Sequence, residues 1–320
     1  MDITQLLSTI YGTDAPRALS LVSSLQEGWR KSHSGSALAE RSNKKVDRHD
    51  IVLITYADSI RRPGEAPLKS LKNFLNEKAP GVVNTVHLLP LNPATSDDGF
   101  SVSNYMELDP ELGSWDDLRS LSFDKSIMLD AVINHSSVSN PWFKAFLDGD
   151  ERYANHYTRY VEGADYSLVV RPRTSPLFTE FQGKGGPVKV WTTFSADQVD
   201  LNFAEPQVLV DVLEVLLFYA SQGARFIRLD AVGFIWKELG TSCMHLPEAH
   251  AIIKVARLVL QEFYPDIALI SETNVPYAEN ISYFGSGDES ALVYQFPCRP
   301  WHCTLIFLEM PAPFLLGQLP

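Results

Sequence analysis

Cysteine is scarce in this sequence: the 320 residues contain three, Cys243, Cys298 and Cys303. They have neither the spacing of a metal site nor the number that a disulfide framework needs. No apolar run reaches the ~18 residues of a membrane-spanning helix, and no charged-then-apolar leader opens the chain. These absences predict a soluble protein of the reducing cytoplasm that has no membrane partner.

Positive charge is also in short supply. Lys and Arg number 27 against 39 Asp and Glu, so the net charge is −12. A duplex-binding protein needs a basic face to release counterions, and we therefore expect no nucleic-acid partner. A neutral sugar is compatible with an acidic protein. With 45% hydrophobic residues, the chain can bury a large core, and one barrel with an insertion fits its length better than two equal domains.

The stretch 223–234, GARFIRLDAVGF, is the most informative part of the sequence. Its apolar residues leave no solvated face, which is typical of a strand buried on both sides in a parallel sheet. Arg228 and Asp230 interrupt the run, and because alternate residues point the same way, they share one face near the carboxyl end. Buried charges are costly unless they are paired or needed. The pair is therefore either a salt bridge that serves the fold alone or part of a site.

Three other apolar stretches also end in polar side chains. They are residues 51–58 ending in Asp58, residues 127–135 ending in Asn134 and His135, and residues 267–272 ending in Glu272. The carboxyl ends of the strands hold the chemistry in (β/α)8 barrels. The repeated pattern predicts an α/β fold of the TIM-barrel type, in which these polar groups converge at one rim.

The remaining patterns predict how the chain is divided. Residues 136–197 have little periodicity and are too long for a plain loop, so we expect a small inserted domain there, with a strand at 191–194. Ser114 is placed to cap a helix that opens at residue 115. The expected layout is a helical extension (1–48, polar from residue 31), the first part of the barrel with strands one to three (49–135), the inserted domain (136–198), the second part with strands four to six (199–297) and a tail (298–320).

Two carboxylates on neighbouring strands suit retaining transfer of a sugar, which needs a nucleophile and a proton donor about 5 to 5.5 Å apart. Adjacent parallel strands are about 4.8 Å apart, so this spacing is attainable. Asp230 lies two residues from Arg228, whose charge should lower its pKa and keep it ionised as the nucleophile. Glu272 has no cation close in sequence and is better suited to donate a proton. His135 and Asp58 would hold sugar hydroxyls.

A metal site is the alternative for the same region. Asp58, Asp130, His135 and Asp230 carry ligand atoms that metal ions bind. However, no His pair or acidic cluster has short ligand spacing, which favours the sugar-transfer interpretation without a metal.

Several separated motifs resemble one enzyme family. DAVINH (130–135), GARFIRLDAVG (223–233) and ISETN (270–274) resemble, in order and spacing, the first three signature regions of the α-amylase superfamily, glycoside hydrolase family thirteen. The sucrose phosphorylase branch is similar in ITYADS (54–59), LDPELGSWDD (108–117), RPR (171–173) and RLDAVGFIWKELGTSC (228–243). Residues 272–296 are most similar to the glucosylglycerate phosphorylase members of that branch. The resemblance covers about residues 50–297.

The resemblance implies a role for each matching residue. Asp230 would be the nucleophile that accepts the glucosyl group, and Glu272 the acid/base. Asp58, His135 and Arg228 would line the subsite that holds the transferred glucose. Inorganic phosphate would be the co-substrate, with no other cofactor.

Two further residues are implied as substrate contacts. Sucrose phosphorylases have a histidine where this chain has Tyr105, so this contact differs and sucrose as the donor is in question. Tyr105 could stack on a sugar ring or simply pack at the surface. Arg173 matches an arginine implicated in the phosphate or acceptor site, where a cation helps phosphate to compete with water; a solvated loop arginine is the alternative.

The resemblance ends near Pro297. The family would continue through Leu-Pro-Pro-Leu, two more strands and a signature with a third catalytic carboxylate, whereas this chain reads Pro-Cys-Arg-Pro-Trp-His-Cys and stops at Pro320. We expect a frameshift or truncation that leaves about six of the eight strands of such a barrel. An unclosed parallel sheet exposes hydrogen-bonding edges, which predicts an unstable or inactive product.

Three functions remain open from the sequence. The first is a glucosyl-transferring phosphorylase of carbohydrate metabolism. The second is a hydrolase or transglucosidase of the same superfamily, which differs in whether phosphate, water or a sugar captures the intermediate. The third is a non-catalytic fragment. The sequence leaves the acceptor and the oligomeric state undetermined.

Overall fold

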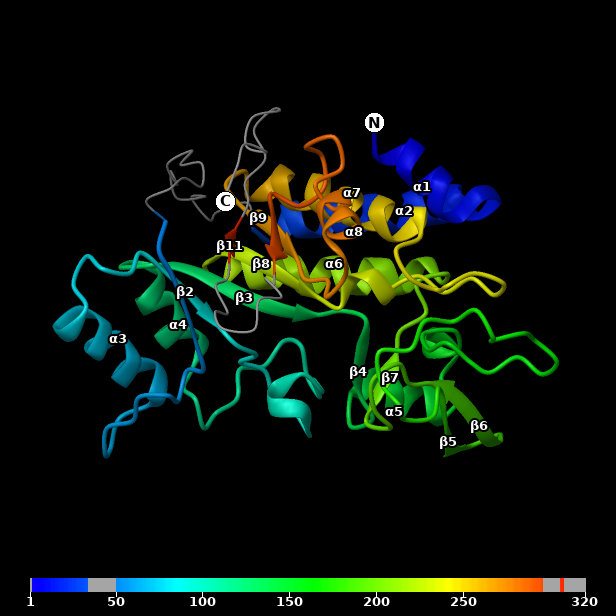
Figure 1. Cartoon of the computed structure of the whole chain (residues 1–320), viewed down its shortest axis with the longest axis horizontal. Coiled ribbons are helices and arrows are strands. Elements are labelled where there is room, and N and C mark those ends of the chain that lie inside the picture. Colours follow the sequence, from blue (N-terminus) through cyan, green and yellow to red (C-terminus); the bar gives the residue numbers. More distant parts are fainter. Residues whose placement is uncertain (1, 34–49, 296–305, 308–320) are drawn as a thin grey trace, which may run out of the picture.

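The computed structural model describes residues 2–33, 50–295 and 306–307 (Figure 1). Its centre is a seven-stranded sheet in the order β1-β2-β3-β8-β9-β10-β11. Neighbours from β1 to β10 are parallel, and β11 joins β10 antiparallel. The strands are β1 (Val52–Thr55), β2 (Thr85–Leu88), β3 (Ser126–Val132), β8 (Ala224–Asp230), β9 (Ala268–Ser271), β10 (Leu292–Gln295) and β11 (Ile306–Phe307).

Helices connect the parallel strands, so the described residues form an incomplete (β/α) barrel, as the sequence predicts. Four of its six parallel strands, β1, β3, β8 and β9, correspond to the apolar runs named above. The connecting helices are α3 (Pro67–Lys78), α4 (Trp115–Ser122), α6 (Pro206–Ser221), α7 (Pro247–Phe263) and α8 (Tyr277–Ser282), with short 3-10 turns at Asp97–Gly99 and Val232–Phe234. Three of these helices, α3, α6 and α7, carry a proline in their first turn, where its missing N–H costs nothing.

The two faces of the sheet pack against different partners. Ile227 and Leu229 of β8 belong to the large core that α6 and α7 complete. Phe226, which precedes Ile227, belongs instead to a small apolar cluster on the inner face, with members from β3, β9 and β10. Arg228 and Asp230 continue this inner face with the period of two that strands require. The buried strand predicted from residues 223–234 is therefore confirmed, and it aims both charged side chains inward.

The long segment after β3 has secondary structure of its own. It contains α5 (Pro141–Leu147), a 3-10 turn (Glu151–Tyr153) and a hairpin of β5 (Phe178–Gly183) and β6 (Gly186–Trp191). β4 (His135–Ser137) pairs antiparallel with β7 (Gln198–Asp200), which brings the two ends of the segment together.

The hairpin corrects one sequence expectation. A strand was expected at 191–194, but β6 ends at Trp191 and begins at Gly186. The alternation of β5 and β6 is obscured in the sequence because most residues of both strands are only partly buried. Gly186, with φ of +112°, closes the tight turn between them, and this backbone conformation favours glycine.

The amino-terminal residues form two helices, α1 (Ile3–Tyr11) and α2 (Ala15–Ser32), separated by a 3-10 turn at Gly12–Asp14. Both helices lie in the part of the chain for which the sequence predicts a helical extension. α1 packs against α7, and α2 packs against α6, so this pair covers the outer helical layer. The expected tail (298–320) lies outside the described residues except for β11, as do residues 34–48 of the expected polar connection.

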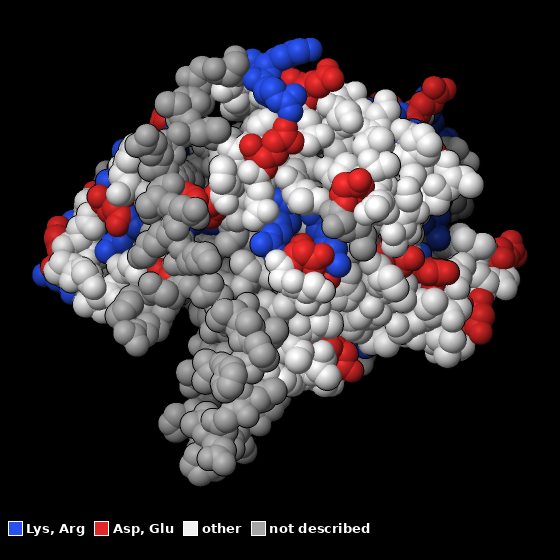
Figure 2. All heavy atoms as spheres, turned by 90° about the horizontal axis from the view of Figure 1, so that it is seen from above, with Lys and Arg blue, Asp and Glu red and all other residues white. Residues whose placement is uncertain are grey.

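The sequence predicts neither a membrane-spanning helix nor a basic surface, and the structure can be compared with both expectations. In the described part of the chain, no helix combines the length and the apolar character that crossing a membrane requires. On the face shown in Figure 2, acidic and basic side chains are interspersed among uncharged residues, and the described atoms of that face present no continuous basic patch.

Helix α4 offers a direct test of a sequence-predicted cap. Ser114 accepts a hydrogen bond from the Asp117 N–H, and the Asp117 carboxylate accepts from the Ser114 N–H at 3.0 Å, which is a capping box. We expect Ser114→Ala to lower the free energy of unfolding by about 1 kcal/mol, measured by urea denaturation. Ser122→Ala, at the other end of α4, is the control and should change it less. Equal losses in the two variants would contradict the capping role.

Candidate active site

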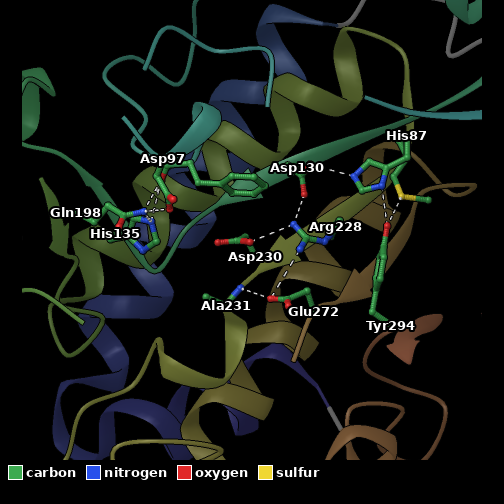
Figure 3. Close-up of polar contacts among 12 residues, drawn as sticks. His87, Asp97, Asp130, His135, Gln198, Arg228, Asp230, Ala231, Glu272 and Tyr294 are labelled. Atoms are coloured by element: carbon green, nitrogen blue, oxygen red, sulfur yellow. Dashed lines mark hydrogen bonds and ion pairs between the residues drawn. The ribbon is translucent and has the colours of Figure 1, made fainter. Parts of the chain in front are cut away.

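Arg228 is the centre of a buried cluster of charged side chains on β3, β8 and the residue that follows β9 (Figure 3). Its Nη1 donates to Oδ1 of Asp130 and, at 3.1 Å, to Oδ1 of Asp230. Its Nη2 lies 3.9 Å from Oε2 of Glu272. One guanidinium therefore approaches three carboxylates, and Asp230 and Glu272, from two neighbouring strands, converge on the same cation.

Asp130 is the most deeply held of these acids. The parallel register of β3 and β8 places it beside Arg228, and His87 on β2 donates to its other oxygen with Nε2 at 3.0 Å. Burial opposes its ionisation, but Arg228 and His87 outweigh burial and hold the pKa of Asp130 below its usual value. Tyr294 on β10 completes the row, with its hydroxyl 2.7 Å from Nδ1 of His87. Four parallel strands thus contribute to one buried polar network.

The structure corrects the expected protonation of Asp230. The charge of Arg228 was expected to lower its pKa. Burial instead raises the pKa of Asp230 to about 7, because lost hydration outweighs the attraction of Arg228, and Glu272 and Asp130 add negative charge. A single cation shared among three carboxylates cannot compensate all of them. Asp230 therefore holds its proton up to near-neutral pH in the unliganded chain.

A strained turn connects the two acids. Ala231, directly after Asp230, has φ of +49°, in the left-handed region that non-glycine residues rarely adopt. This conformation lets its N–H donate to Oε2 of Glu272 at 3.2 Å. The Glu272 N–H in turn donates to the Leu229 carbonyl at 3.0 Å. The backbone around the end of β8 thus fixes Glu272 from both sides.

A cavity of about 580 Å³ opens over this cluster. Its size lies in the range of small-molecule sites. It is lined by Tyr56, Asp97, Asp98, Phe100, His135, Val170, Pro172, Arg173, Phe194, Gln198, Asp230, Ala231, Gly233, Phe234, Met244, His245, Glu272, Thr273 and Asn274. Asp97, Asp98, Ala231 and His245 are four of the five non-glycine residues with positive φ in the described chain. Backbone strain is therefore concentrated in the cavity wall.

The structure brings most of the predicted site residues to this cavity. Asp230, Glu272, His135 and Arg173 line it. Arg228 lies directly behind Asp230 and contacts both acids.

Two predicted substrate contacts lie elsewhere. Asp58 is partly exposed, pairs with Arg61 at 2.8 Å and does not line the cavity. Tyr105 is 4% exposed, packs against Trp142 and donates its hydroxyl to the His135 carbonyl at 2.8 Å. The ring is therefore a support beneath the wall that holds His135. Both interpretations offered by the sequence, stacking on a sugar and packing at the surface, require an accessible ring, whereas this ring is buried beside Trp142 of α5.

His135 is held as a neutral hydrogen-bonding group. Nε2 donates to the Phe100 carbonyl at 2.9 Å, and Nδ1 accepts from the Asn134 amide at 3.2 Å. Burial lowers the pKa of His135, which favours this neutral form. Gln198 joins the group by donating to Asp97 at 2.8 Å (Figure 3).

Sequence reasoning missed several residues of the wall. Asp97 and Asp98 had a detectable signal, because they follow a predicted strand, but they received no role. Gln198, at the start of the short strand β7, and His245, in the irregular connection after β8, had none. Phe100 follows the 3-10 turn at Asp97–Gly99, and its ring lies 5.7 Å from the Arg228 guanidinium.

The four residues of the alternative metal site do not share one centre. Asp130 binds Arg228 and His87, Asp58 binds Arg61, and His135 faces the Phe100 carbonyl. Across the described residues, no group of three or more His, Cys, Asp or Glu side chains has an arrangement that could hold a metal ion.

Known proteins resemble the chain in both sequence and fold. It is 50% identical over 299 residues to a glucosylglycerate phosphorylase of Allomeiothermus silvanus, covering 93% of this chain and 52% of that protein. The glucosylglycerate phosphorylase of Escherichia coli K12 is 41% identical over 302 residues, covering 93% of this chain and 53% of its own length. The chain thus spans about half the length of the curated relatives it matches.

A solved structure agrees with these relatives. The crystal structure of sucrose 6F-phosphate phosphorylase from Thermoanaerobacter thermosaccharolyticum superposes with a TM-score of 0.70 at 28% identity, covering 80% of this chain and 53% of that one. Residues 81–305 match the family model described as "Alpha amylase, catalytic domain". The matched range includes Asp130, Arg228, Asp230 and Glu272, the charged cluster beneath the cavity. The chain therefore belongs to the alpha-amylase family of catalytic domains.

Proposed function

We propose that this chain carries the nucleophile and the acid/base of a retaining α-glucosyl phosphorylase, with Asp230 and Glu272 in these roles. The observation that supports this most is the convergence of the two carboxylates on Arg228 at the floor of one cavity. Two acids on neighbouring strands match the needs of retaining transfer. The relatives named glucosylglycerate phosphorylase favour glucosylglycerate over sucrose as the substrate.

The reaction would proceed in two displacements. The ionised form of Asp230, which forms as pH rises through about 7, attacks the anomeric carbon while the bond to the leaving oxygen breaks, and Glu272 gives its proton to that oxygen. A glucosyl ester on Asp230 results. A phosphate oxygen then attacks the same carbon, the ester bond breaks, and Glu272 recovers a proton from the phosphate. Two inversions give glucose 1-phosphate with retained configuration.

Other residues would bind and select the reactants. His135 would bind a sugar hydroxyl by exchanging the bond that its Nε2 makes with the Phe100 carbonyl, and Arg228 would keep both acids in position. Arg173 lies at the cavity wall on an exposed loop and would attract phosphate, which must compete with water for the ester. Inorganic phosphate is then the co-substrate, and no metal or other cofactor takes part.

The setting of the reaction and the layout of the chain belong to the same proposal. We place the reaction in carbohydrate metabolism in the cytoplasm, in keeping with the scarce and unpatterned cysteines. The chain would consist of a helical extension, two barrel parts and an inserted domain over residues 136–198 that forms one wall of the site.

A second candidate is a chain that binds sugar without turnover. The observation that favours it is that this chain spans about half the length of its relatives. The two acids lie in the given residues, and turnover would also need any group that the relatives contribute from the half that this chain does not match.

An assay on a chimera tests the proposed chemistry. We would join residues 1–295 to the remaining part of the Allomeiothermus silvanus relative and supply glucosylglycerate with phosphate. We expect the chimera to release glucose 1-phosphate, and the unjoined chain to release far less. Glu272→Gln in the chimera should reduce the rate by about 10²–10⁴. Glu279→Gln, an exposed glutamate on α8, is the control. A chimera that releases only glucose would be a hydrolase, and unchanged turnover in Glu272→Gln would overturn the assignment.

Arg173 gives a test of phosphate capture. In the chimera, we expect Arg173→Ala to raise the ratio of glucose to glucose 1-phosphate by about tenfold, since loss of one charged contact is worth on the order of 1.4 kcal/mol. The neighbouring Arg171→Ala should leave the ratio unchanged, because the Arg171 guanidinium donates to the Ser175 carbonyl instead. A product ratio that is the same in all three proteins would show that Arg173 is a solvated loop residue.

The raised pKa of Asp230 predicts a pH-dependent stability. The folded chain takes up a proton that the unfolded chain releases, so the stabilisation is complete below the usual carboxyl pKa and is lost as pH rises through about 7. Between about pH 4 and 7, wild type should lose stability relative to Asp230→Asn, by on the order of 4 kcal/mol. Urea denaturation across this range measures the difference. Asp148→Asn, at an exposed position, should show the same pH dependence of the free energy of unfolding as wild type. If Asp230→Asn also showed that pH dependence, the raised pKa would be refuted.

A further inference from the structure

His245 occupies a place in the cavity that the proposed chemistry does not yet use. It lies in the loop between β8 and α7, and it lines the cavity beside Gly233 and Met244. We propose that Nε2 of His245 donates a hydrogen bond to an anionic oxygen, carboxylate or phosphate, of the group that leaves or attacks the transferred sugar. This inference rests on the function proposed above and adds the residue that recognises the acceptor.

The position of the ring proton follows from Tyr283. The Tyr283 hydroxyl lies 2.5 Å from Nδ1 of His245, and the tyrosine is fully buried. Burial raises the pKa of Tyr283, so the hydroxyl keeps its proton and can donate it to Nδ1. Burial also lowers the pKa of His245, which favours a neutral ring. A neutral ring that accepts at Nδ1 carries its own hydrogen on Nε2.

This Nε2 is left without a partner. The atom is buried, and no hydrogen-bonding group of the described residues lies within reach of it. Buried donors in folded proteins are almost always paired, because water is no longer available to them. An unpaired donor beside a cavity therefore indicates an acceptor that comes from outside the chain.

The surrounding backbone is built to hold the ring in place. His245 has φ of +56°, and its N–H donates to the Gly233 carbonyl at 2.9 Å. A Cβ at position 233 would lie 2.7 Å from Cε1 of His245, so only glycine leaves room for the ring. Strain and close approach of this kind persist where the surrounding structure holds a side chain for a purpose.

The position of His245 in the cavity points to the acceptor rather than to the transferred sugar. Phe100, His135 and Gln198 line the opposite part of the wall and come from the connection after β2, from β4 and from β7. His245, like Thr273 and Asn274, comes from the connections after β8 and β9, which also carry Glu272. Because the acid/base must lie beside the leaving oxygen, the acceptor belongs on this side. Phosphate and glycerate both carry oxygens that only accept, which matches a group that only donates.

Two substitutions of His245 test the roles of its two ring nitrogens independently. Asn at position 245 tolerates the positive φ and can place its amide oxygen near Tyr283, but it has no group at the position of Nε2. Gln can place an amide N–H at that position. Calorimetric titration of the full chain with inorganic phosphate, D-glycerate and glucose would measure binding. We expect His245→Asn to weaken phosphate, glycerate or both at least tenfold, His245→Gln to restore part of the loss, and glucose binding to change little.

Imidazole ¹⁵N spectra of the histidine-labelled chain report the ring nitrogens of His245 directly. If the role of His245 were purely structural, these chemical shifts would not change when an anion is added. We expect the His245 signal to show the proton on Nε2 and to shift on addition of the anion that binds. Tyr283→Phe should mix the tautomers and reduce this shift, whereas His250→Gln, behind Tyr283 and outside the cavity wall, should preserve it.

Unchanged anion binding in His245→Asn, or a proton on Nδ1 in wild type, would overturn the proposal. Failure of the chimera to form glucose 1-phosphate would instead count against the proposed function, because anion binding by His245 is measured without turnover.

Discussion

The sharing of one guanidinium among three carboxylates is the interaction on which the site depends. Arg228 is buried, and a buried cation needs partners. Asp130, Asp230 and Glu272 supply them from three adjacent positions of the sheet, and no two of these residues could be brought together by local sequence alone. The parallel register of β3, β8 and β9 is therefore what creates the cluster. It also leaves an excess of negative charge, which is why Asp230 retains a proton that its neighbour Arg228 by itself would remove.

Much of this arrangement can be predicted from the sequence, because buried parallel strands have a clear signature. The run from Ala224 to Asp230 has no solvated face, and its two charges lie two residues apart, which is enough to place them inward at a carboxyl end. The same reasoning anticipates Glu272 after its strand and Ser114 at its helix. In each of these cases, the information lies within a few residues of the side chain concerned.

The remaining features depend on contacts that no local pattern records. The pKa of Asp230 reflects charges from three strands, of which the sequence displays only Arg228 nearby. Tyr105 looks like an exposed loop tyrosine until the fold places its hydroxyl against the His135 carbonyl. His245 becomes informative only when Tyr283, 38 residues later, is seen at its Nδ1. Irregular connections have no period, so the residues that they contribute to a cavity have to be found in the structure.

The strained backbone of the cavity wall has a consequence for engineering. Replacing Ala231 by glycine would remove the steric penalty of its positive φ, and the change would look favourable to anyone seeking a more heat-resistant protein. The same change would enlarge the set of shapes that the wall can adopt, since glycine is free on both sides of the conformational map. Such a variant would tolerate heat better, but its cavity wall would no longer be held in one conformation before a ligand binds.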